Sequence, residues 1–487
     1  MNDWLVWRLS FALIFGAAVT WVLYRTADPP DFLRPKKNQT RFRPLFFYGT
    51  LPLFFLVLLP FLPYTLGHGG FNTLLGTLSQ VFLQLAFYDS AMLLLLPLLR
   101  RYLQPQTCVF LWMLPNYLYL ALNASSQPPR PLVIIPVPLS AWAFQAVCWV
   151  WLAGFVGVLG WKIFSHLRFR RRILKDAHTI TDSQTVLLWQ ELAQWAGYPD
   201  RCHAPVLSPA VSAPLSIGLL ASTVRVVLPQ RSYTQEELAL IFRHELIHIG
   251  RADSSAKFFL TFCSALCWFN PLVWSAMARG AEELELSCDQ EVLDHIGQAG
   301  GEGYARLLLS TAGEQSGFTT CLSASASALR YRLRHVLHPA YRGIHGWVAG
   351  LAIAALMLTS GWITLSYGRG SGRDLLLPPA ASGPCQIESV YRFQDREGME
   401  CKIGDQDALL DYLGGLELRT VLGSYDYPPD GRWLSMTFLG PENKRLHLTV
   451  QEDMAYTYLV NAPSFHQAYQ VAGGVDWDYL DSLLVPV

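Results

Sequence analysis

The chain has 487 residues, of which 52% are hydrophobic and only 15% are charged. That balance is unlike an ordinary soluble protein, and the length is sufficient for several domains. The formal net charge is zero, so the chain as a whole gives no electrostatic basis for binding nucleic acid directly. The nine cysteines include no Cys-x-x-Cys pair, which excludes a zinc ribbon and a thioredoxin motif.

Apolar runs near the length that a bilayer requires, about 20 residues, recur along the chain. They occur at 4–24, 44–64, 79–99, 107–123, 139–164 and 344–366. The first has no basic segment before it and no small-residue cleavage site, so it is expected to be a retained span. The fourth contains Pro115, so residues 79–123 form either two spans or a re-entrant hairpin.

Lysine and arginine beside these runs indicate their orientation, because short basic loops stay on the cytoplasmic side. The loop 25–43, the turn at Arg100 and Arg101, and the segment 162–175 are basic, whereas 64–71 and 124–138 together contain only Arg130. Six alternating spans therefore place the N-terminus and residues 367–487 outside the membrane, and residues 165–343 inside.

The segment 165–343 opens with a basic helix, and 178–196 has the pattern of an amphipathic helix. Residues 213–229 contain Gly218 and a β-branched run, which predicts a strand or hairpin ending at Pro229. Thr234 and Glu237 then form a capping box, which begins a helix that continues to about Ile249.

This helix carries the candidate chemistry. His244 and His248 of a His-Glu-Leu-Ile-His motif are four residues apart, so both imidazoles lie on one helix face and can bind one Zn²⁺. Glu245 is offset toward the open coordination position, where it can act as general base. The alternative is a chance pattern, which would show no preference for a capped helix.

A catalytic zinc ion requires a third protein ligand. Glu285 and Asp289 are four residues apart in an acidic cluster over 280–292, so one can bind zinc while the other accepts the N–H of a ligand histidine. The alternative is a solvated acidic helix face. Cys263, Cys267 and Cys288 are also nearby, but cysteines at helical spacing in an apolar run favour packing over ligation.

The segment 258–278 is apolar enough to be another span, yet a membrane between His248 and Glu285 would prevent them from sharing a metal. Asn270-Pro271 breaks the run near its middle. We therefore expect a re-entrant or interfacial hairpin, which places the site at the inner membrane surface. Otherwise, the acidic helix does not supply the third ligand.

These residues resemble the BlaR/MecR-type membrane metallopeptidases, the β-lactam sensor-transducers of bacteria and their relatives. The resemblance is carried by 244–253 (His-Glu-Leu-Ile-His-Ile-Gly-Arg-Ala-Asp), 268–274 (Trp-Phe-Asn-Pro-Leu-Val-Trp), 283–289 (Glu-Leu-Glu-Leu-Ser-Cys-Asp), 292–293, 214–218 and 226–229. It covers the spans and the cytoplasmic segment, and its combined motifs are far more specific than the histidine motif alone.

The resemblance implies that His244, His248 and Glu285 bind zinc, with Glu245 as general base. Asp289, and with less support Asp253, would orient these ligands, while Arg251 could equally be a surface charge. In such gluzincin-like folds the substrate adds as a strand at a sheet edge, for which 223–228 is the candidate.

The resemblance also implies a substrate. The transducers cleave, or trigger cleavage of, a cytoplasmic winged-helix repressor of the BlaI/MecI type, in the bacterial cytoplasmic membrane. Some also cut themselves before the last span. Here that stretch is 317–337, which otherwise reads as a flexible linker followed by a basic juxtamembrane helix.

The tail departs from the family pattern. Residues 367–487 contain no Ser-x-x-Lys, Ser-Asp-Asn or Lys-Thr-Gly motif, so we do not expect a β-lactam to be the signal. A linker at 368–384 precedes a small α+β domain with a helix at 405–415, strands at 433–439, 446–450 and 456–460, and a helix at 477–484. Cys385 and Cys401 form either a disulfide or two free thiols. The aromatics Tyr425, Tyr427 and Trp433 line a ligand site or pack into a core.

The sequence thus predicts a polytopic α-helical membrane protein with an inserted cytoplasmic gluzincin-like α+β zinc peptidase domain and a small extracytoplasmic α+β domain. The expected units are helices over 1–164, the peptidase domain 165–343 with a membrane-associated hairpin at 258–278, the last transmembrane helix 344–366 and a sensor domain 367–487.

Three functions remain open at this stage. The leading hypothesis is a transducer that cuts a cytoplasmic repressor when an unknown extracytoplasmic ligand moves the last span. A constitutive protease that removes damaged membrane proteins would act independently of residues 367–487. A non-catalytic zinc-bound receptor would have no need of Glu245.

Overall fold

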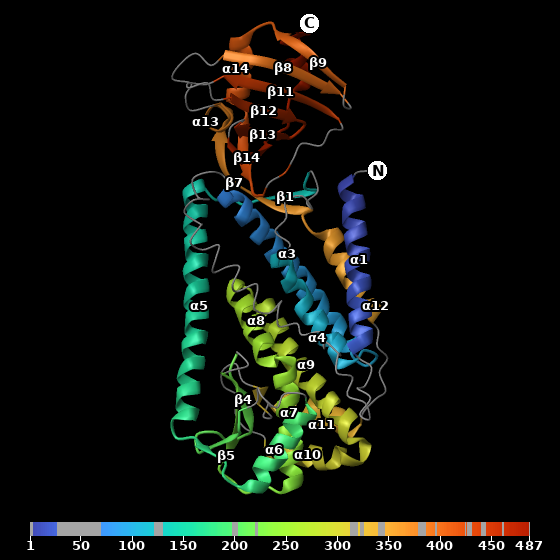
Figure 1. Cartoon of the computed structure of the whole chain (residues 1–487). Coiled ribbons are helices and arrows are strands. Elements are labelled where there is room, and N and C mark those ends of the chain that lie inside the picture. The colour runs from blue at the N-terminus through green and yellow to red at the C-terminus, as the bar shows by residue number, and fades with distance from the viewer. Residues whose placement is uncertain are drawn as a thin grey trace.

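The computed structural model describes residues 3–26, 70–120, 130–196, 203–219, 223–311, 320–321, 326–338, 346–377, 386–394, 397–423, 425, 431–439, 445–459 and 462–486. Figure 1 shows a large β-sheet at one end, long helices through the middle, and a region of mixed helices and short strands at the opposite end. The chain passes between these ends several times, so each region contains segments far apart in sequence.

The apolar runs form the middle helices. They are α1 (Asp3–Thr26), α3 (Gly70–Leu99), α5 (Ala141–Lys175) and α12 (Gly346–Thr359). Among the described helices, the stretches 74–99 and 141–175 are long and apolar enough to cross a bilayer, while 8–18 and 347–359 are shorter apolar helices. The predicted span 44–64 lies outside the described residues.

Two of the predicted spans are shorter than expected. The run 107–123 forms α4 (Pro105–Met113) and then a 3-10 helix, η1 (Leu114–Leu120), because Pro115 cannot donate the hydrogen bond that would continue α4. The run 344–366 is helical only to Thr359. Gly361 takes a φ of 80°, which ends the helix, and strand β7 (Ile363–Ser371) begins two residues later.

The segment 258–278 forms the turn of a helical hairpin, as expected from Asn270-Pro271. Helices α8 (Asp253–Leu266) and α9 (Pro271–Ile296) pack against one another. The Asn270 side chain accepts a hydrogen bond from the amide of Leu272, and Pro271 occupies the first turn of α9, where it has no bond to break.

The tip of this hairpin is fastened to α5 by two tryptophans. The Trp151 indole donates to the carbonyl of Leu266 at 2.9 Å, and the Trp268 indole donates to the carbonyl of Trp151 at 3.1 Å. A Cβ atom at Gly154 would lie 2.2 Å from the Trp268 ring, so glycine permits this close approach.

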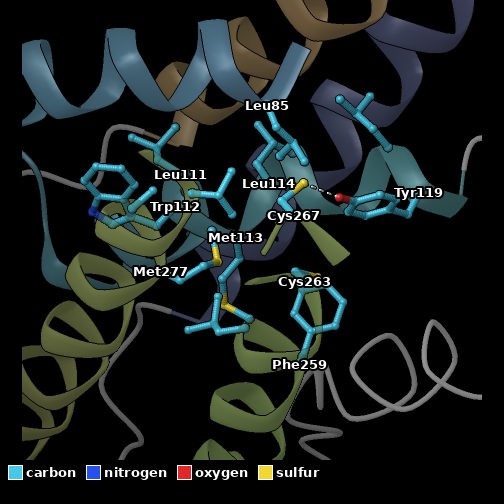
Figure 2. Packing of buried hydrophobic residues seen from close by; sticks show 14 of the residues in the cluster. Leu85, Leu111, Trp112, Met113, Leu114, Tyr119, Phe259, Cys263, Cys267 and Met277 are labelled. Atoms are coloured by element: carbon cyan, nitrogen blue, oxygen red, sulfur yellow. Dashed lines mark hydrogen bonds between the residues drawn. The ribbon is translucent and has the colours of Figure 1, made fainter. Parts of the chain in front are cut away.

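The hairpin, α4 and α3 enclose the central core (Figure 2). Buried side chains from all of these elements meet there, among them Leu85, Trp112, Met113, Phe259, Cys263 and Met277. The Tyr119 hydroxyl and the Cys267 sulfur are 3.1 Å apart. Cys263 and Cys267 are therefore core residues, as their helical spacing predicts.

The mixed region contains a five-stranded sheet with the order β2-β3-β5-β4-β6. Its strands are β2 (His178–Thr179), β3 (Val206–Ser208), β4 (Leu215–Ile217), β5 (Arg225–Pro229) and β6 (Thr320–Cys321). The helices beside them are α6 (Ser183–Trp195), α7 (Gln235–Arg251), α10 (Gly301–Ser310) and α11 (Ala326–Leu337). The short 3-10 helix η4 (Gln298–Gly300) precedes α10.

The hairpin expected over 213–229 is present as β4 and β5, but the choice of 223–228 as the open sheet edge is wrong. Strand β5 pairs with β3 in parallel and with β4 in antiparallel orientation, so both of its edges are occupied. Its residues Val226, Val227 and Leu228 are buried, as a continuous apolar run in an interior strand requires.

The C-terminal region is a ten-stranded sheet with the order β1-β7-β10-β14-β13-β12-β11-β8-β9-β15. In addition to β7, its strands are β1 (Val133–Pro136), β8 (Gln386–Gln394), β9 (Glu397–Ile403), β10 (Glu417–Val421), β11 (Arg432–Leu439), β12 (Arg445–Gln451), β13 (Met454–Leu459), β14 (Ala462–Val471) and β15 (Leu484–Pro486). Its helices are α13 (Gly372–Leu375), α14 (Gln406–Gly415) and α15 (Trp477–Ser482).

Several predictions for this domain need correction. Strand β7 starts at Ile363, inside the predicted last span, and part of the predicted linker is β7 and α13. Cys401 is a buried free thiol in the structure, and Cys385, its partner in the disulfide alternative, lies outside the described residues. Tyr425 and Trp433 are buried and pack in the domain, whereas Tyr427 lies outside the described residues.

The C-terminal sheet is joined directly to the helices. Strand β1, from the loop before α5, pairs in parallel with β7, which follows α12. The Gln80 amide of α3 donates to the Tyr425 hydroxyl at 2.6 Å, and a Cβ atom at Gly76 of α3 would lie 2.2 Å from the amide nitrogen of Gly423. The sheet is therefore in direct contact with α3, and its strand β7 follows α12 along the chain.

Candidate metal centre

Helix α7 positions the two motif histidines. It begins at the predicted capping box, in which the Glu237 amide donates to Thr234 Oγ1 at 3.1 Å and the Thr234 amide donates to Glu237 Oε2 at 2.9 Å. His244, Glu245 and His248 are each at most 1% exposed. The Nε2 atoms of the two histidines lie 3.0 Å apart, so their rings converge on one point.

Helix α9 brings the acidic cluster to the same point. Glu285 Oε2 lies 3.6 Å from His248 Nε2 and 3.9 Å from His244 Nε2. Along the chain, the whole of α8 lies between the two helices that carry these residues. Three ligands at about 2.0–2.2 Å from a tetrahedral metal ion are separated by similar distances. The alternative of a solvated acidic face is wrong for Glu285, which is 3% exposed.

The donor set fits a cation. Glu285 Oε2 is buried and accepts no hydrogen bond from the described residues. His248 Nδ1 is 2.7 Å from Asp253 Oδ2, and His244 Nδ1 is 2.8 Å from the Tyr304 hydroxyl. With an N–H at each Nδ1, each Nε2 keeps its lone pair, and Glu285 Oε2 faces both of these nitrogens.

The orienting residues differ in one respect from the prediction. Asp253 accepts directly from His248, and Arg251 Nε donates to the other oxygen of Asp253 at 3.2 Å. Asp289 does not reach His244 directly, because its Oδ1 is 3.7 Å from His244 Nδ1. The Tyr304 hydroxyl lies between them and donates to Asp289 Oδ1 at 2.7 Å.

Burial and neighbouring charges set the protonation of the two histidines. Burial, followed by the proximity of His248, lowers the pKa of His244 well below 6.5. Burial opposes protonation of His248 as well, but the Glu285 carboxylate and the hydrogen bond to Asp253 outweigh it and raise the pKa of His248 well above 6.5. Without a cation, the two rings therefore share one positive charge, which is a second proton on His248. A metal ion would replace that proton.

Neighbouring cationic groups keep Glu285 ionised. Burial alone would raise its pKa, but Lys257, His248 and Arg332 outweigh burial and hold the pKa of Glu285 well below 4.5. Lys257 Nζ donates to Glu285 Oε1 at 2.7 Å, and Arg332 Nη1 lies 3.4 Å from Oε2. The carboxylate is thus available as an anionic ligand.

Cys288 offers a second combination, since its sulfur and ring nitrogens of His244 and His248 lie within 4.8 Å of one another. The sulfur is 3.6 Å from His244 Nδ1, which is the side of the ring away from Nε2. Burial raises the pKa of the Cys288 thiol to about 11, so it is neutral. Glu285 is charged and faces both Nε2 atoms, and it is the better third ligand.

Three residues of the site were not identified from the sequence. Tyr304 shares the buried face of α10 with Leu307 and Leu308, a spacing that indicates only a core position. Arg332 is one of three similar arginines, and Lys257 lies in a run of mixed residues. Only their placement in the fold distinguishes them from packing or surface residues.

Comparison with known proteins agrees with this geometry. Residues 134–336 match the family described as BlaR1 peptidase M56, a range that contains α7, α9 and every residue of the centre. The chain is also similar to the regulatory protein BlaR1 of Bacillus licheniformis, with 24% identity over 186 residues, covering 38% of this chain and 30% of that relative. This match spans less than a third of the relative's length. The match over residues 134–336 confirms the resemblance to BlaR/MecR-type metallopeptidases that the motifs of this chain indicate.

Proposed function

We propose that the chain is a membrane-embedded zinc metalloendopeptidase in which His244, His248 and Glu285 bind the metal. The observation that carries this proposal is the convergence of two buried Nε2 atoms and one buried carboxylate oxygen within 3.0 to 3.9 Å of one another. Zinc is the expected ion because two imidazoles and a carboxylate on a helical His-x-x-x-His frame suit its tetrahedral preference.

A zinc ion held by these groups would act as a Lewis acid toward a water molecule and a peptide carbonyl. Glu245, buried beside His244, would take a proton from the attacking water and deliver it to the leaving amine. Asp253 keeps the His248 ring in the tautomer with a free Nε2, and Tyr304 does the same for His244. Burial of these groups excludes bulk water and strengthens each interaction.

The substrate would bind as a strand along β4 and not along β5. Strand β4 lies against α7, and its pairing with β5 leaves the opposite edge for another strand. In the structure, β6 occupies that edge, pairing Cys321 with Leu215 and Thr320 with Ser216. A substrate strand would therefore displace β6, which lies within the stretch 317–337 before the last apolar helix.

We place α3 and α5 across the bacterial cytoplasmic membrane, with α1 and α12 beside them. The N-terminus of α1 and the C-terminal sheet lie at one end of the helices and α7 lies at the other, which agrees with the orientation expected from the basic loops (Figure 1). The hairpin tip contacts Trp151, near the middle of the predicted span 139–164, which supports a re-entrant hairpin.

The coupling of the C-terminal sheet to α3 and α12 favours a signal transducer over a constitutive protease. We propose that an extracytoplasmic ligand other than a β-lactam acts on this sheet, and that the substrate is a cytoplasmic winged-helix repressor of the BlaI/MecI type. The enzyme itself would make no direct contact with nucleic acid.

The decisive experiment compares Glu245→Gln with Glu236→Gln, an exposed residue at the start of the same helix. Zinc content and cleavage of a co-expressed winged-helix repressor are measured for both purified variants. We expect Glu245→Gln to retain about one zinc per chain and to lose cleavage by about 10²- to 10⁴-fold. Glu236→Gln should resemble the wild type. Normal cleavage by Glu245→Gln, or a wild-type chain without zinc, would refute the proposal.

A further inference from the structure

Helix α11 carries three arginines that the structure treats differently. Arg330 and Arg334 are exposed, whereas Arg332 is 1% exposed. A guanidinium is retained inside a protein only where anionic partners compensate for its lost hydration. Asp289 and Glu285 of the candidate metal centre are two such partners of Arg332, so the expectation of a basic juxtamembrane helix does not describe this residue.

Arg332 binds Asp289 through two parallel bonds. Its Nε donates to Oδ2 at 2.7 Å, and its Nη2 donates to Oδ1 at 2.6 Å. This bidentate geometry fixes the plane of the carboxylate as well as its position. The third nitrogen, Nη1, lies 3.4 Å from Glu285 Oε2, the oxygen that faces both histidines.

Through Asp289, Arg332 also acts on His244. The Tyr304 hydroxyl donates to Asp289 Oδ1, so it can only accept from His244 Nδ1, which therefore carries the proton. Arg332 thus interacts with two of the three proposed ligands, one directly and one through other residues. It contacts Glu285 directly, and it reaches His244 through Asp289 and Tyr304.

Helix α11 is also a structural junction. The Arg100 guanidinium, just after α3, lies 4.5 Å from the centre of the Tyr331 ring and pairs with Glu283 of α9 at 3.5 Å. His335 Nε2 lies 2.8 Å from Gln290 Oε1 of α9. Along the chain, α11 leads to α12, and both α3 and α12 contact the C-terminal sheet at their other ends.

We propose that Arg332 is a positioning residue for the metal centre, and that α11 couples the metal affinity of the centre to the placement of α3 and α12. With α11 docked, Asp289 is neutralised and Tyr304 and Glu285 are held in place. With α11 displaced, Asp289 loses its bidentate cationic partner, Glu285 keeps only its pair with Lys257, and the Tyr304 hydroxyl that fixes the His244 tautomer is less firmly held. The inference rests on the proposed zinc site, whose own failure would appear in the wild type.

The test measures Zn²⁺ affinity by chelator competition in purified full-length wild type, Arg332→Met, Arg332→Lys and the exposed control Arg334→Met. Two effects of Arg332→Met have opposite signs. Removing a nearby positive charge without loss of position would tighten binding of a cation. Loss of a residue that orients ligands weakens it by about 10- to 100-fold.

We expect Arg332→Met to weaken Zn²⁺ binding by this amount. Arg332→Lys should weaken it less, because lysine keeps the charge but cannot form the bidentate pair, and Arg334→Met should leave it unchanged. Co²⁺ is used as a second probe, because its visible absorption reports ligand geometry only in folded protein. The spectrum should change in Arg332→Met and not in Arg334→Met. A double variant, Arg332→Met with Asp289→Asn, keeps the test valid if the single variant folds poorly.

Hydrogen exchange tests the coupling. Because coupling between sites is reciprocal, Zn²⁺ should slow exchange of the amides of α11 around Tyr331 to Val336. Unchanged or tighter zinc binding in Arg332→Met, or α11 exchange insensitive to zinc, would overturn the inference. A wild type that binds no zinc would instead refute the proposed function.

Discussion

The hydroxyl of Tyr304 provides a direct test of the geometry of the metal centre. It accepts from His244 Nδ1 at 2.8 Å and donates to Asp289 Oδ1 at 2.7 Å, and the side chain is fully buried. Tyr304→Phe removes one oxygen atom and preserves the packing of the ring. The change leaves His244 Nδ1 without its acceptor and Asp289 with one bond fewer.

Two effects follow, with separable magnitudes. A residue that orients a metal ligand typically contributes 10- to 100-fold to metal affinity, which is about 1.4 to 2.8 kcal/mol of binding free energy. The two lost hydrogen bonds should also lower the free energy of unfolding of the metal-free protein by about 1 to 3 kcal/mol. The loss of Zn²⁺ affinity in Tyr304→Phe should be larger than the loss caused by removing a tyrosine hydroxyl bond far from the metal centre.

The assay is chelator competition for Zn²⁺, together with denaturant unfolding of the metal-free protein. Tyr412→Phe is a matched control, because the Tyr412 hydroxyl accepts from the amide of Asp476 at 2.7 Å in the C-terminal sheet domain, far from the metal. It should lower stability and leave zinc affinity unchanged. If Tyr304→Phe binds zinc as tightly as the wild type, the tyrosine does not orient His244 and the reasoning fails.

Further predictions address the third ligand, the interdomain contact and acid stability. Glu285→Gln should lower zinc affinity by well over 100-fold, beyond the about 10- to 100-fold of an orienting residue, whereas Cys288→Ser should retain zinc; the opposite result would assign Cys288 as the ligand. Gly76→Ala should lower the melting temperature, although alanine favours a helix, because its Cβ would lie 2.2 Å from the Gly423 amide nitrogen. Gly157→Ala in α5, with no atom within 4 Å of the added Cβ, is the control and should be neutral or stabilising. Because the folded pKa of Glu285 is depressed, its contribution to metal-free stability is present above the ordinary value of 4.5 and is lost as the pH falls through the folded value. As the pH falls from 4.5 toward the folded value, the free energy of unfolding of the wild type should therefore fall more steeply than that of Glu285→Gln in denaturant titrations. Equal slopes would contradict the shift.

Much of the fold followed from local patterns. The capping box at Thr234, the break at Asn270-Pro271, and the C-terminal helix at 405–415 and strands at 433–439 and 446–450 agree with the structure, because each depends on residues within one or two turns of chain. Hydropathy was less reliable at 344–366, where an apolar run continues from helix into strand. Apolar composition alone does not distinguish a membrane helix from a buried strand.

The sequence by itself determined the spacing of His244, Glu245 and His248 and the pairing of Glu285 with Asp289, because helical periodicity places residues four apart on one face. Only the tertiary structure decided that Tyr304 lies between His244 and Asp289, and that Arg332 turns inward while its neighbouring arginines remain exposed. It also decided that β5 is an interior strand and that β1 joins the C-terminal sheet. These features depend on contacts between segments far apart in the chain, and no local pattern of residues specifies which distant partner a tyrosine, an arginine or a strand will meet.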